Sequence, residues 1–317
     1  MKKLKELYPE VLEDVEIKGI SINSKEIKTG DLFVCTMGAT RDRHDFIDDA
    51  IENGAAAVVV SKDVGEKSVP IIKVEDTNKE LPYLCQRFYD YPDQKLKMIA
   101  VTGTDGKTTT TTIVQTLIGR DLCGYIGTNG RSYGDFDGDN PNTTPDAQNM
   151  YMYLNEFVEH GCKYASIETS SEAFFRGRLQ AMEFDISAMT NVTSEHLNIH
   201  GSFDNYLESK LMLFKQTKKD GYSILNHDDK YYEQTRKACN AKNVLTYGTS
   251  EDNDLQIVEF KVHPDHTDIT FKYKGEELKI NSPLLGDFNV YNLACALLCT
   301  ISAGYELEDI LPKIKNL

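Results

Sequence analysis

Residues 102–112 read TGTDGKTTTTT, and this stretch decides the fold of the chain around it. The apolar run Met98–Val101 precedes it and Thr112–Ile118 follows it, which predicts a strand, a glycine turn and a helix in that order. In such a turn, glycines let backbone N–H groups converge on an anion, and the start of the helix adds positive partial charge. Lys107 adds a full positive charge at the same place.

The loop departs from the usual phosphate-binding pattern, G-x-x-x-x-G-K-[ST], because Val101 stands where the first glycine is expected. Thr108 or Thr109 can still offer a hydroxyl group to a magnesium ion that is bound to phosphate. The stretch therefore predicts nucleotide phosphate binding, and the alternative is a structural turn that is rich in glycine and threonine.

Length and composition indicate an ordinary globular chain with about two domains. It has 317 residues, of which 40% are hydrophobic and 27% are charged, and this is enough to build sizeable cores. The net charge of −15 argues against nucleic acid or an anionic membrane surface as the main partner. A bound phosphate would therefore be held by the geometry of the loop, because the chain has no basic field to attract it.

The lack of a recognisable targeting signal and the pattern of cysteines lead us to expect a cytoplasmic protein. The first 19 residues lack an apolar core of signal-peptide length, and no run of 18 apolar residues occurs, so no membrane insertion is expected. The seven cysteines are scattered without C-x-x-C spacing, which is typical of reduced thiols in protein cores. The same spacing argues against a zinc site built on cysteine.

The pattern from Glu16 to about Tyr91 predicts a small α/β unit. Strands are expected at residues 30–35, 55–60 and 69–74, and helices at 46–53 and 78–89. The polar residues 90–94 are the best candidate for a boundary, so the predicted domains are residues 1–93 and 94–317.

From Lys95 onward the predicted strands and helices alternate, which indicates a doubly wound, mostly parallel sheet. Strands are expected at residues 98–101, 164–167, 185–189 and 222–225, with helices at 146–160, 203–216 and 289–302. Residues 255–280 instead alternate polar and apolar side chains around Lys274 and Gly275, which predicts an antiparallel β excursion.

Three candidate site residues follow from the rule that ligands bind at the carboxyl ends of strands in such sheets. Glu168 comes directly after a predicted strand and could hold magnesium, or it could cap a helix or form an ion pair. His196 also follows a strand end and could be a second metal ligand or a polar loop residue. Lys210 falls on the next helix, where a lysine usually lies on the surface.

Several short motifs occur along the chain, and their combination and order are more specific for a function than any one motif alone. These motifs are TGTDGKTTT from residue 102, NTTPD at 142–146, ETSS at 168–171, Thr190-Asn191, His196, His200-Gly201, Lys210, and GDFN at 286–289 with Asn292. Together they resemble the Mur ligases, the ATP-dependent enzymes that build the peptide stem of peptidoglycan. NTTPD and His-x3-His-Gly are similar to the E type, which adds the third stem residue to UDP-N-acetylmuramoyl-dipeptide.

The first unit agrees with this resemblance. Ser24-Lys25, residues 30–34 and His44-x-Phe46 are similar to the UDP-binding domain of the family, so the resemblance covers essentially the whole chain. It implies a central ATPase domain with a phosphate loop over residues 94–317. In this family a third domain normally follows, which binds the incoming amino acid, and it is expected to be absent from these 317 residues.

The resemblance implies a role for each matching position. The residues expected around ATP are Gly103, Thr104, Asp105, Gly106, Lys107, Thr108, Thr109, Asn289 and Asn292. Two magnesium ions are expected on Thr108, Glu168, His196 and Lys210, the last as a carbamate. The residues expected to contact the UDP-muramoyl peptide are Ser24, His44, Thr143, Thr144, Ser171 and Arg178. Lys107, Glu168, His196 and Lys210 would carry the catalysis.

Several positions differ from the family pattern. Asp105 stands where asparagine is usual, and Glu172 and Arg176 flank the substrate motif, where they could pair with each other or recognise an altered muramoyl peptide. The predicted function is an ATP-dependent amide ligase of peptidoglycan synthesis that shows little turnover as this chain alone. The alternatives are a module that binds ATP and a UDP-sugar without ligation, or another ligase of the superfamily, of the F, cyanophycin or folate type.

Overall fold

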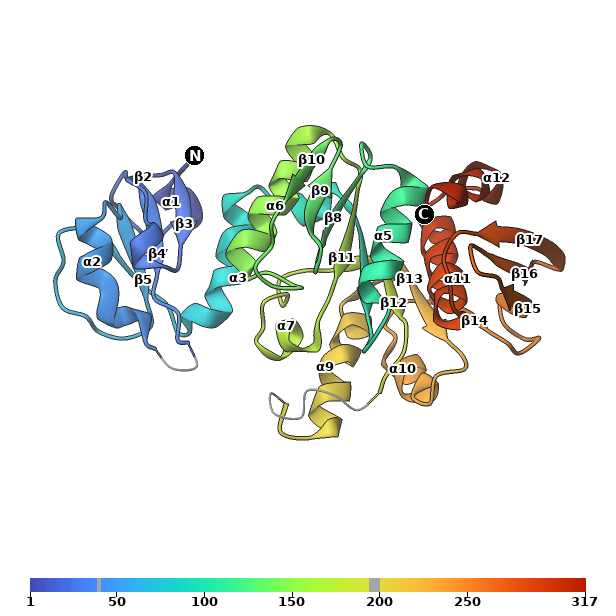
Figure 1. Cartoon of the computed structure of the whole chain (residues 1–317). Coiled ribbons are helices and arrows are strands. Elements are labelled where there is room, and N and C mark those ends of the chain that lie inside the picture. Colours follow the sequence, from blue (N-terminus) through green and yellow to red (C-terminus); the bar gives the residue numbers. More distant parts are fainter. Residues whose placement is uncertain (39–40, 194–199) are drawn as a thin grey trace. The chain divides into compact units, whose positions relative to one another are not determined.

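The computed structural model describes residues 1–38, 41–193 and 200–317, which form two compact units (Figure 1). The first unit contains Met1–Pro92, Asp146–Met152 and Gly177–Ala181. The second contains Asp93–Pro145, Tyr153–Arg176 and Met182–Leu317. Among the helices of the described ranges, none combines the length and the apolar content that a bilayer crossing requires.

The first unit is built on a four-stranded parallel sheet of order β3-β4-β5-β6. The strands are β3 (Gly19–Ser21), β4 (Asp31–Val34), β5 (Ala57–Val60) and β6 (Ile71–Lys73). The helical segments are α1 (Leu4–Leu7), η1 (Ser24–Glu26), η2 (Arg43–Phe46), α2 (Ile47–Glu52) and α3 (Thr77–Phe88). Strands β1 (Lys2–Lys3) and β2 (Glu16–Ile17) form a separate, two-stranded antiparallel sheet. The strands and helices expected at residues 30–89 are therefore confirmed.

The second unit contains an eleven-stranded sheet of order β10-β9-β8-β11-β7-β12-β13-β14-β15-β16-β17. Its parallel centre consists of β8 (Cys123–Gly127), β11 (Tyr164–Glu168), β7 (Lys97–Thr102), β12 (Phe184–Met189), β13 (Thr217–Asn226) and β14 (Asn243–Gly248). The expected antiparallel excursion is confirmed as β15 (Leu255–Val262), β16 (Thr267–Tyr273) and β17 (Glu276–Ser282). The opposite edge carries a hairpin that the sequence did not predict, β9 (Gly130–Tyr133) and β10 (Phe136–Gly138).

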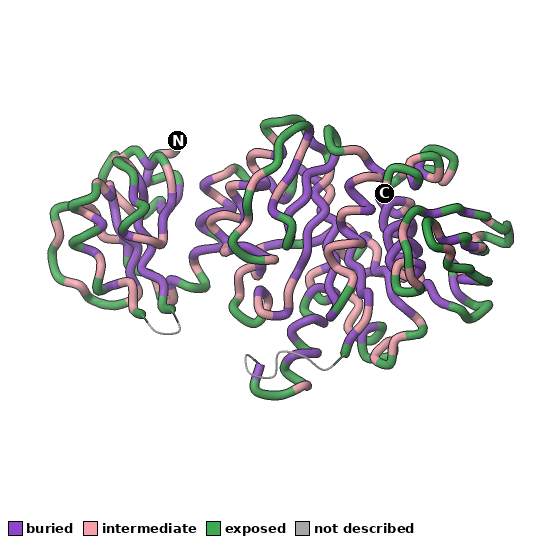
Figure 2. The backbone as a smooth tube through the Cα atoms, viewed as in Figure 1, coloured by how far each residue is buried: buried purple, intermediate pink, exposed green. Residues whose placement is uncertain are grey.

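The remaining helices of the chain are α4 (Pro92–Lys95), α5 (Lys107–Ile118), α6 (Ala147–His160), α7 (Ser171–Phe175), α9 (Phe203–Lys215), α10 (Tyr232–Ala238), α11 (Asp287–Ser302) and α12 (Leu307–Ile310), followed by η3 (Leu311–Asn316). Helices α4 and α6 contain residues of both units. Helices α5 and α11 pack against each other, and their apolar faces join the strands in one core. Figure 2 shows buried residues running along the central strands, while exposed residues lie in the outer turns. This core holds the start of α5 in place.

Helix α5 begins with a run of threonines, which are poor helix formers because their branched side chains are stiff. Their hydroxyl groups instead donate to carbonyl oxygens one turn earlier: Thr111 to Lys107 at 2.8 Å and Thr112 to Thr108 at 2.8 Å. Ser166 of β11 donates to the Thr111 carbonyl at 2.9 Å and ties the helix to the sheet. Tertiary contacts thus stabilise a helix that propensity alone would disfavour.

Candidate active site

The loop between β7 and α5 has the backbone that an anion site requires. Gly103 and Gly106 have φ angles of 153° and 83°, and Gly106 is the N-cap of α5. A Cβ atom on Gly103 would lie 1.9 Å from the Thr190 hydroxyl oxygen, and one on Gly106 would lie 2.2 Å from Asn292 Oδ1. Both positions therefore need glycine for backbone conformation and for space, and the loop presents the start of a helix to solvent.

Gly106→Ala should lower the free energy of unfolding by about 2–4 kcal/mol, because left-handed strain and overpacking add to each other. The matched control is Gly275→Ala in the β16–β17 turn, where φ is 87° and nothing lies within 4 Å of the added Cβ atom. The free energy of unfolding of the control should fall by about 1–2 kcal/mol, because only the strain of the left-handed backbone applies there. Urea unfolding of both variants measures the difference, and equal losses would show that Asn292 does not restrict this loop.

Two lysine side chains converge on the same loop. Lys107 Nζ donates to the carbonyl oxygens of Gly103 at 2.9 Å and Thr104 at 2.7 Å. Lys210 is only 2% exposed, and its Nζ donates to the Gly103 carbonyl at 2.6 Å. The Lys210 Nζ atom also lies 4.6 Å from the centre of the Tyr206 ring, whose hydroxyl group lies 2.9 Å from Thr104 Oγ1. Two lysine side chains at one carbonyl bring positive charge to the loop, and this suits a phosphate group.

Glu168 lies at the end of β11 and is fully buried. Its Oε1 atom accepts hydrogen bonds from the Tyr125 hydroxyl at 2.6 Å and the Thr128 amide at 2.9 Å. Its Oε2 atom accepts from the hydroxyl groups of Thr108 at 2.9 Å and Thr128 at 3.1 Å. Burial, and next the charge of Glu168, raise the pKa of Tyr125, so this phenol stays protonated as a donor. The site fits a magnesium ion because Thr108 and Glu168 bring oxygen ligands into direct contact.

The structure separates the two threonines that the loop pattern could not distinguish. Thr108 faces Glu168, whereas Thr109 lines a cavity on the other side of the loop. Gly127 makes room for the Glu168 carboxylate, since a Cβ atom there would lie 2.1 Å from Oε1. This glycine and Tyr125 were not identified from the sequence. Both lie on β8, a strand that was not predicted, and recognising that strand would have been the one signal for them.

A cavity of about 990 Å³ adjoins the loop, which is large enough for a nucleotide. It is lined by Asp105, Gly106, Thr109, Thr190, Asn191, Val192, Thr193, Asn226, Asp228, Asp229, Lys230, Tyr231, Phe288, Tyr291 and Asn292. Burial and a hydrogen bond to Asp228 raise the pKa of Tyr291 to about 12, and its hydroxyl group donates to Asp228 Oδ2 at 2.8 Å. Phe288 is 65% exposed and offers a ring face on which a base could stack.

Of the two asparagines expected near the adenosine, Asn292 lines this cavity and Asn289 supports it. Asn292 Nδ2 donates to Asn289 Oδ1 at 3.1 Å, and Asn289 Nδ2 donates to the Leu285 carbonyl at 2.9 Å. Asp105 is held at the rim, because its amide donates to Asn191 Oδ1 at 3.0 Å and its carbonyl accepts from the Thr190 hydroxyl at 2.5 Å. Hydrogen bonds therefore join the loop to the two residues that follow β12.

Three of the candidate substrate residues lie in the second unit, close to the Glu168 motif. The Thr143 hydroxyl lies 3.0 Å from that of Thr128, and the buried Thr144 hydroxyl donates to the Glu168 carbonyl at 2.8 Å. Ser171 Oγ lies 3.1 Å from His200 Nε2. The structure thus brings Thr143, Thr144 and Ser171 to the edge of the metal-ligand candidates.

Glu172 of α7 pairs with Arg176, which directly follows that helix, with Arg176 Nε 2.7 Å from Glu172 Oε1. The first of the two expectations for these residues, an internal pair, is therefore observed. In the first unit, Arg178 Nε pairs with Asp146 Oδ1 at 2.9 Å. Each arginine therefore has an acidic partner in its own unit.

Ser24 and His44 are both 7% exposed in the first unit. The Ser24 carbonyl accepts from Asn53 Nδ2 at 3.0 Å. His44 Nε2 accepts from the Ser61 amide at 3.0 Å, which leaves Nδ1 to donate to Asp42 Oδ1 at 2.5 Å. Both ring nitrogens of His44 thus have partners within this unit, and a role along UDP stays a prediction. The remaining candidate, His196, lies outside the described residues.

Comparisons with known proteins agree with this geometry. The model of the Mur ligase family catalytic domain matches residues 16–101, and that of the Mur ligase middle domain matches residues 101–300. The UDP-N-acetylmuramoyl-L-alanyl-D-glutamate–2,6-diaminopimelate ligase of Fusobacterium nucleatum is 34% identical over 317 aligned residues, which span 97% of this chain and 64% of that protein. The chain thus spans somewhat less than two thirds of the length of this relative.

Solved structures support the same assignment. A UDP-N-acetylmuramoyl-L-alanyl-D-glutamate–2,6-diaminopimelate ligase matches with a TM-score of 0.85 and 26% identity, covering 100% of this chain and 66% of the other. A MurF ligase from Thermotoga maritima in complex with ADP matches in fold, with a TM-score of 0.70 and 22% identity over 95% of this chain and 67% of the other. The family models, the relatives and the site geometry together show that this chain belongs to the Mur ligase family.

Proposed function

We propose that the chain carries the nucleotide-binding and acceptor-binding parts of an ATP-dependent ligase that adds the third stem amino acid to UDP-N-acetylmuramoyl-dipeptide. The observation that carries the proposal is the contact between Thr108 and Glu168 beside the phosphate loop, at the carboxyl ends of β7 and β11. The relative from Fusobacterium nucleatum, a diaminopimelate ligase by name, supports the acceptor and makes diaminopimelate the first amino acid to test.

The reaction must make a carboxylate electrophilic, because its negative charge repels an amine and oxide cannot leave. The acceptor carboxylate would take the γ-phosphoryl group of ATP and release ADP. The amine would then attack the resulting acyl phosphate, and an amide would form as phosphate leaves and the amine loses a proton. Positioning and charge neutralisation are the main contributions of a protein to such a transfer. Lys107 and the amides of the Gly103–Gly106 loop would hold the phosphates, and the 990 Å³ cavity would hold the adenosine.

The donor set fits the metal ions that the family implies. Thr108 and Glu168 would hold one magnesium ion, and His196 with a carbamate on Lys210 would hold a second. Bound magnesium would offset the negative charge on the transferring phosphoryl group. Thr143, Thr144, Ser171 and Arg178 would contact the muramoyl peptide, and Ser24 and His44 the UDP. The free thiols of all seven cysteines support a reducing compartment such as the cytoplasm.

Carbamylation of Lys210 is expected when bicarbonate and magnesium are supplied together. In the structure the buried Nζ atom sits at the Gly103 carbonyl and over the Tyr206 ring, where the space is enclosed and the amine is held at the loop. Incubation with ¹³C-bicarbonate should give one carbamate signal that Lys210→Ala removes and Lys219→Ala, at an exposed lysine, retains. A signal that persists in Lys210→Ala would contradict the assignment.

The experiment for the proposed function is calorimetric binding of ATP·Mg and, separately, of UDP-N-acetylmuramoyl-dipeptide to the purified chain. Both should bind, and omission of magnesium should weaken ATP binding. A chain that binds ATP·Mg but prefers another carboxylate acceptor would favour a different ligase of the superfamily. Phosphate release that requires the dipeptide and an amino acid distinguishes a ligase from a module that only binds nucleotide and UDP-sugar.

A further inference from the structure

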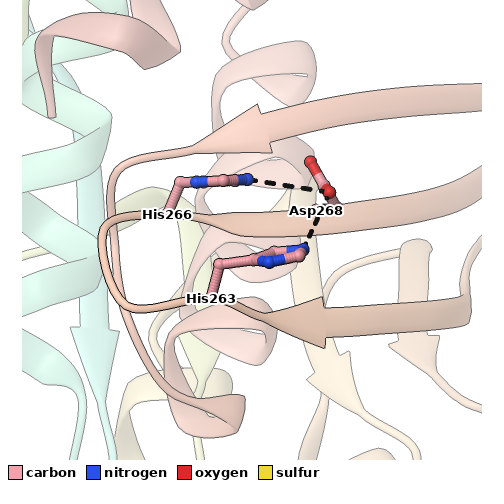
Figure 3. Close-up of side chains that lie close together, drawn as sticks. All are labelled: His263, His266 and Asp268. Carbon is pink, nitrogen blue, oxygen red and sulfur yellow. Dashed lines mark ion pairs between the residues drawn. The ribbon is translucent and has the colours of Figure 1, made fainter.

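The tip of the β15–β16 hairpin gathers two histidines and an aspartate (Figure 3). The turn is tight, because the His263 amide donates to the His266 carbonyl at 2.8 Å and Val262 pairs with Thr267 across the strands. His263 follows β15, His266 precedes β16, and Asp268 lies on β16. Ligand atoms of these three residues all lie within 4.8 Å of one another.

The spacing of these atoms matches a small coordination sphere. Asp268 Oδ2 lies 3.1 Å from His263 Nε2 and 3.7 Å from His266 Nε2. Bonds of about 2.0–2.1 Å to a tetrahedral zinc ion place neighbouring ligand atoms about 3.3–3.5 Å apart, between these two values. The two imidazole rings are stacked, with centroids 4.4 Å apart and planes inclined by 13°, so both rings present the same edge to Asp268 (Figure 3).

Neighbouring groups orient these ligands as they do in metal sites. Asp265 Oδ1 lies 2.8 Å from His266 Nδ1, so this nitrogen donates to the carboxylate and Nε2 is the ring atom that faces Asp268. Asn281 Nδ2 donates to Asp268 Oδ1 at 2.9 Å and leaves Oδ2 for the histidines. His263 Nε2 is shielded from solvent and faces Asp268 Oδ2 at 3.1 Å, in an ion pair that does not have the geometry of a hydrogen bond. A buried nitrogen of this kind is normally satisfied, and a cation would satisfy it.

We propose that His263, His266 and Asp268 bind one zinc ion, with the fourth position open to water. Two imidazoles and one carboxylate suit zinc better than magnesium, which prefers oxygen ligands only. The site is separate from the loop chemistry, because β12, β13, β14 and β15 lie between β7 and β16 in the sheet. The ion fastens the end of β15 to β16 and so stiffens the antiparallel edge. Protonated histidines paired with Asp268 are the competing explanation.

The test uses the full 317-residue chain without an affinity tag, stripped with a chelator and kept in excess magnesium. Zinc is titrated in competition with a chromogenic chelator of known affinity. The parent chain should bind about one zinc ion more tightly than any second one, and its thermal unfolding midpoint should rise. The double variant His263→Ala/His266→Ala and the single variant Asp268→Asn should each bind zinc at least tenfold more weakly.

Two further variants test the orienting role of Asp265 and control for the loss of a histidine elsewhere. Asp265→Asn removes only the group that orients His266, so its zinc affinity should fall by about 10- to 100-fold. His160→Ala removes an exposed histidine at the end of α6 and should bind zinc as the parent does. Unfolding midpoints of the metal-free variants should match the parent, since the changed side chains lie at a hairpin tip. Equal zinc affinity in the parent and the double variant, or no zinc binding at all, would overturn the proposal.

Discussion

Replacing Lys107 with alanine should abolish measurable ATP·Mg binding while the chain stays folded. The Lys107 ammonium group lies at the mouth of the phosphate loop, bonded to two loop carbonyl oxygens. Hydrogen bonds to charged groups contribute about 1.5–3 kcal/mol each, so if this ammonium group turned two of its bonds to phosphate oxygens, its loss would weaken binding by about 100-fold or more. Stability should change little, because the core of this unit is formed by the central strands with α5 and α11.

Isothermal titration of ATP·Mg measures this loss, and urea unfolding checks the fold. Lys219→Ala is the matched control, because it removes an exposed lysine of β13. The control separates the local effect of Lys107 from the change in net charge, which is the same in both variants. If Lys107→Ala bound ATP·Mg as tightly as the parent, residues 102–108 would not be a phosphate loop.

Glu168→Gln should remove the magnesium dependence of ATP binding. The carboxylate accepts hydrogen bonds from Tyr125, Thr128 and Thr108. An amide offers one acceptor oxygen in place of two, and its N–H groups would face the hydroxyl donors. An amide oxygen also lacks the charge that attracts a divalent cation. Leaving buried donors unsatisfied costs about 1–3 kcal/mol, so stability should fall by a similar amount.

Calorimetry with and without magnesium separates the two effects of this substitution. The parent should bind ATP more tightly with magnesium, whereas Glu168→Gln should show the same weak affinity in both conditions. Glu159→Gln, at an exposed residue of α6, should behave like the parent. A full magnesium effect in Glu168→Gln would mean that Glu168 is a structural carboxylate that only organises Tyr125, Thr128 and Thr108.

Local patterns were sufficient for most of the parallel centre and for the antiparallel excursion. The predicted strand at residues 185–189 lies within β12 (Phe184–Met189), and Lys274 and Gly275 form the turn between β16 and β17. Buried strands carry continuous apolar runs, and a two-residue hairpin turn needs residues that tolerate positive φ angles. Both features can therefore be recognised from a few neighbouring residues. The two glycines of the phosphate loop were recognisable for the same reason.

The missed elements are those whose local pattern is weak. Strand β8 contains Gly124 and Gly127, which lower strand propensity, and the chain then turns at once into the β9–β10 hairpin. Gly127 is required by the Glu168 side chain, and Gly124 by the ring of Phe157, which would lie 2.2 Å from a Cβ atom. These are contacts with residues 33 and 41 positions away, so a local pattern could not indicate why glycine occurs there.

The sequence by itself determined that a glycine-rich turn joins a strand to a helix, which predicts a phosphate loop, and that a carboxylate follows a strand end and a lysine lies one helix later. These features depend on residue type and on spacing within single strand–loop–helix segments. Only the tertiary structure decided that Thr108 faces Glu168, and that residues 228–231 line one cavity together with Phe288, Tyr291 and Asn292. The physical reason is that these contacts depend on strand order and side-chain direction, which pack residues from distant segments against each other and are set only when the whole sheet has formed.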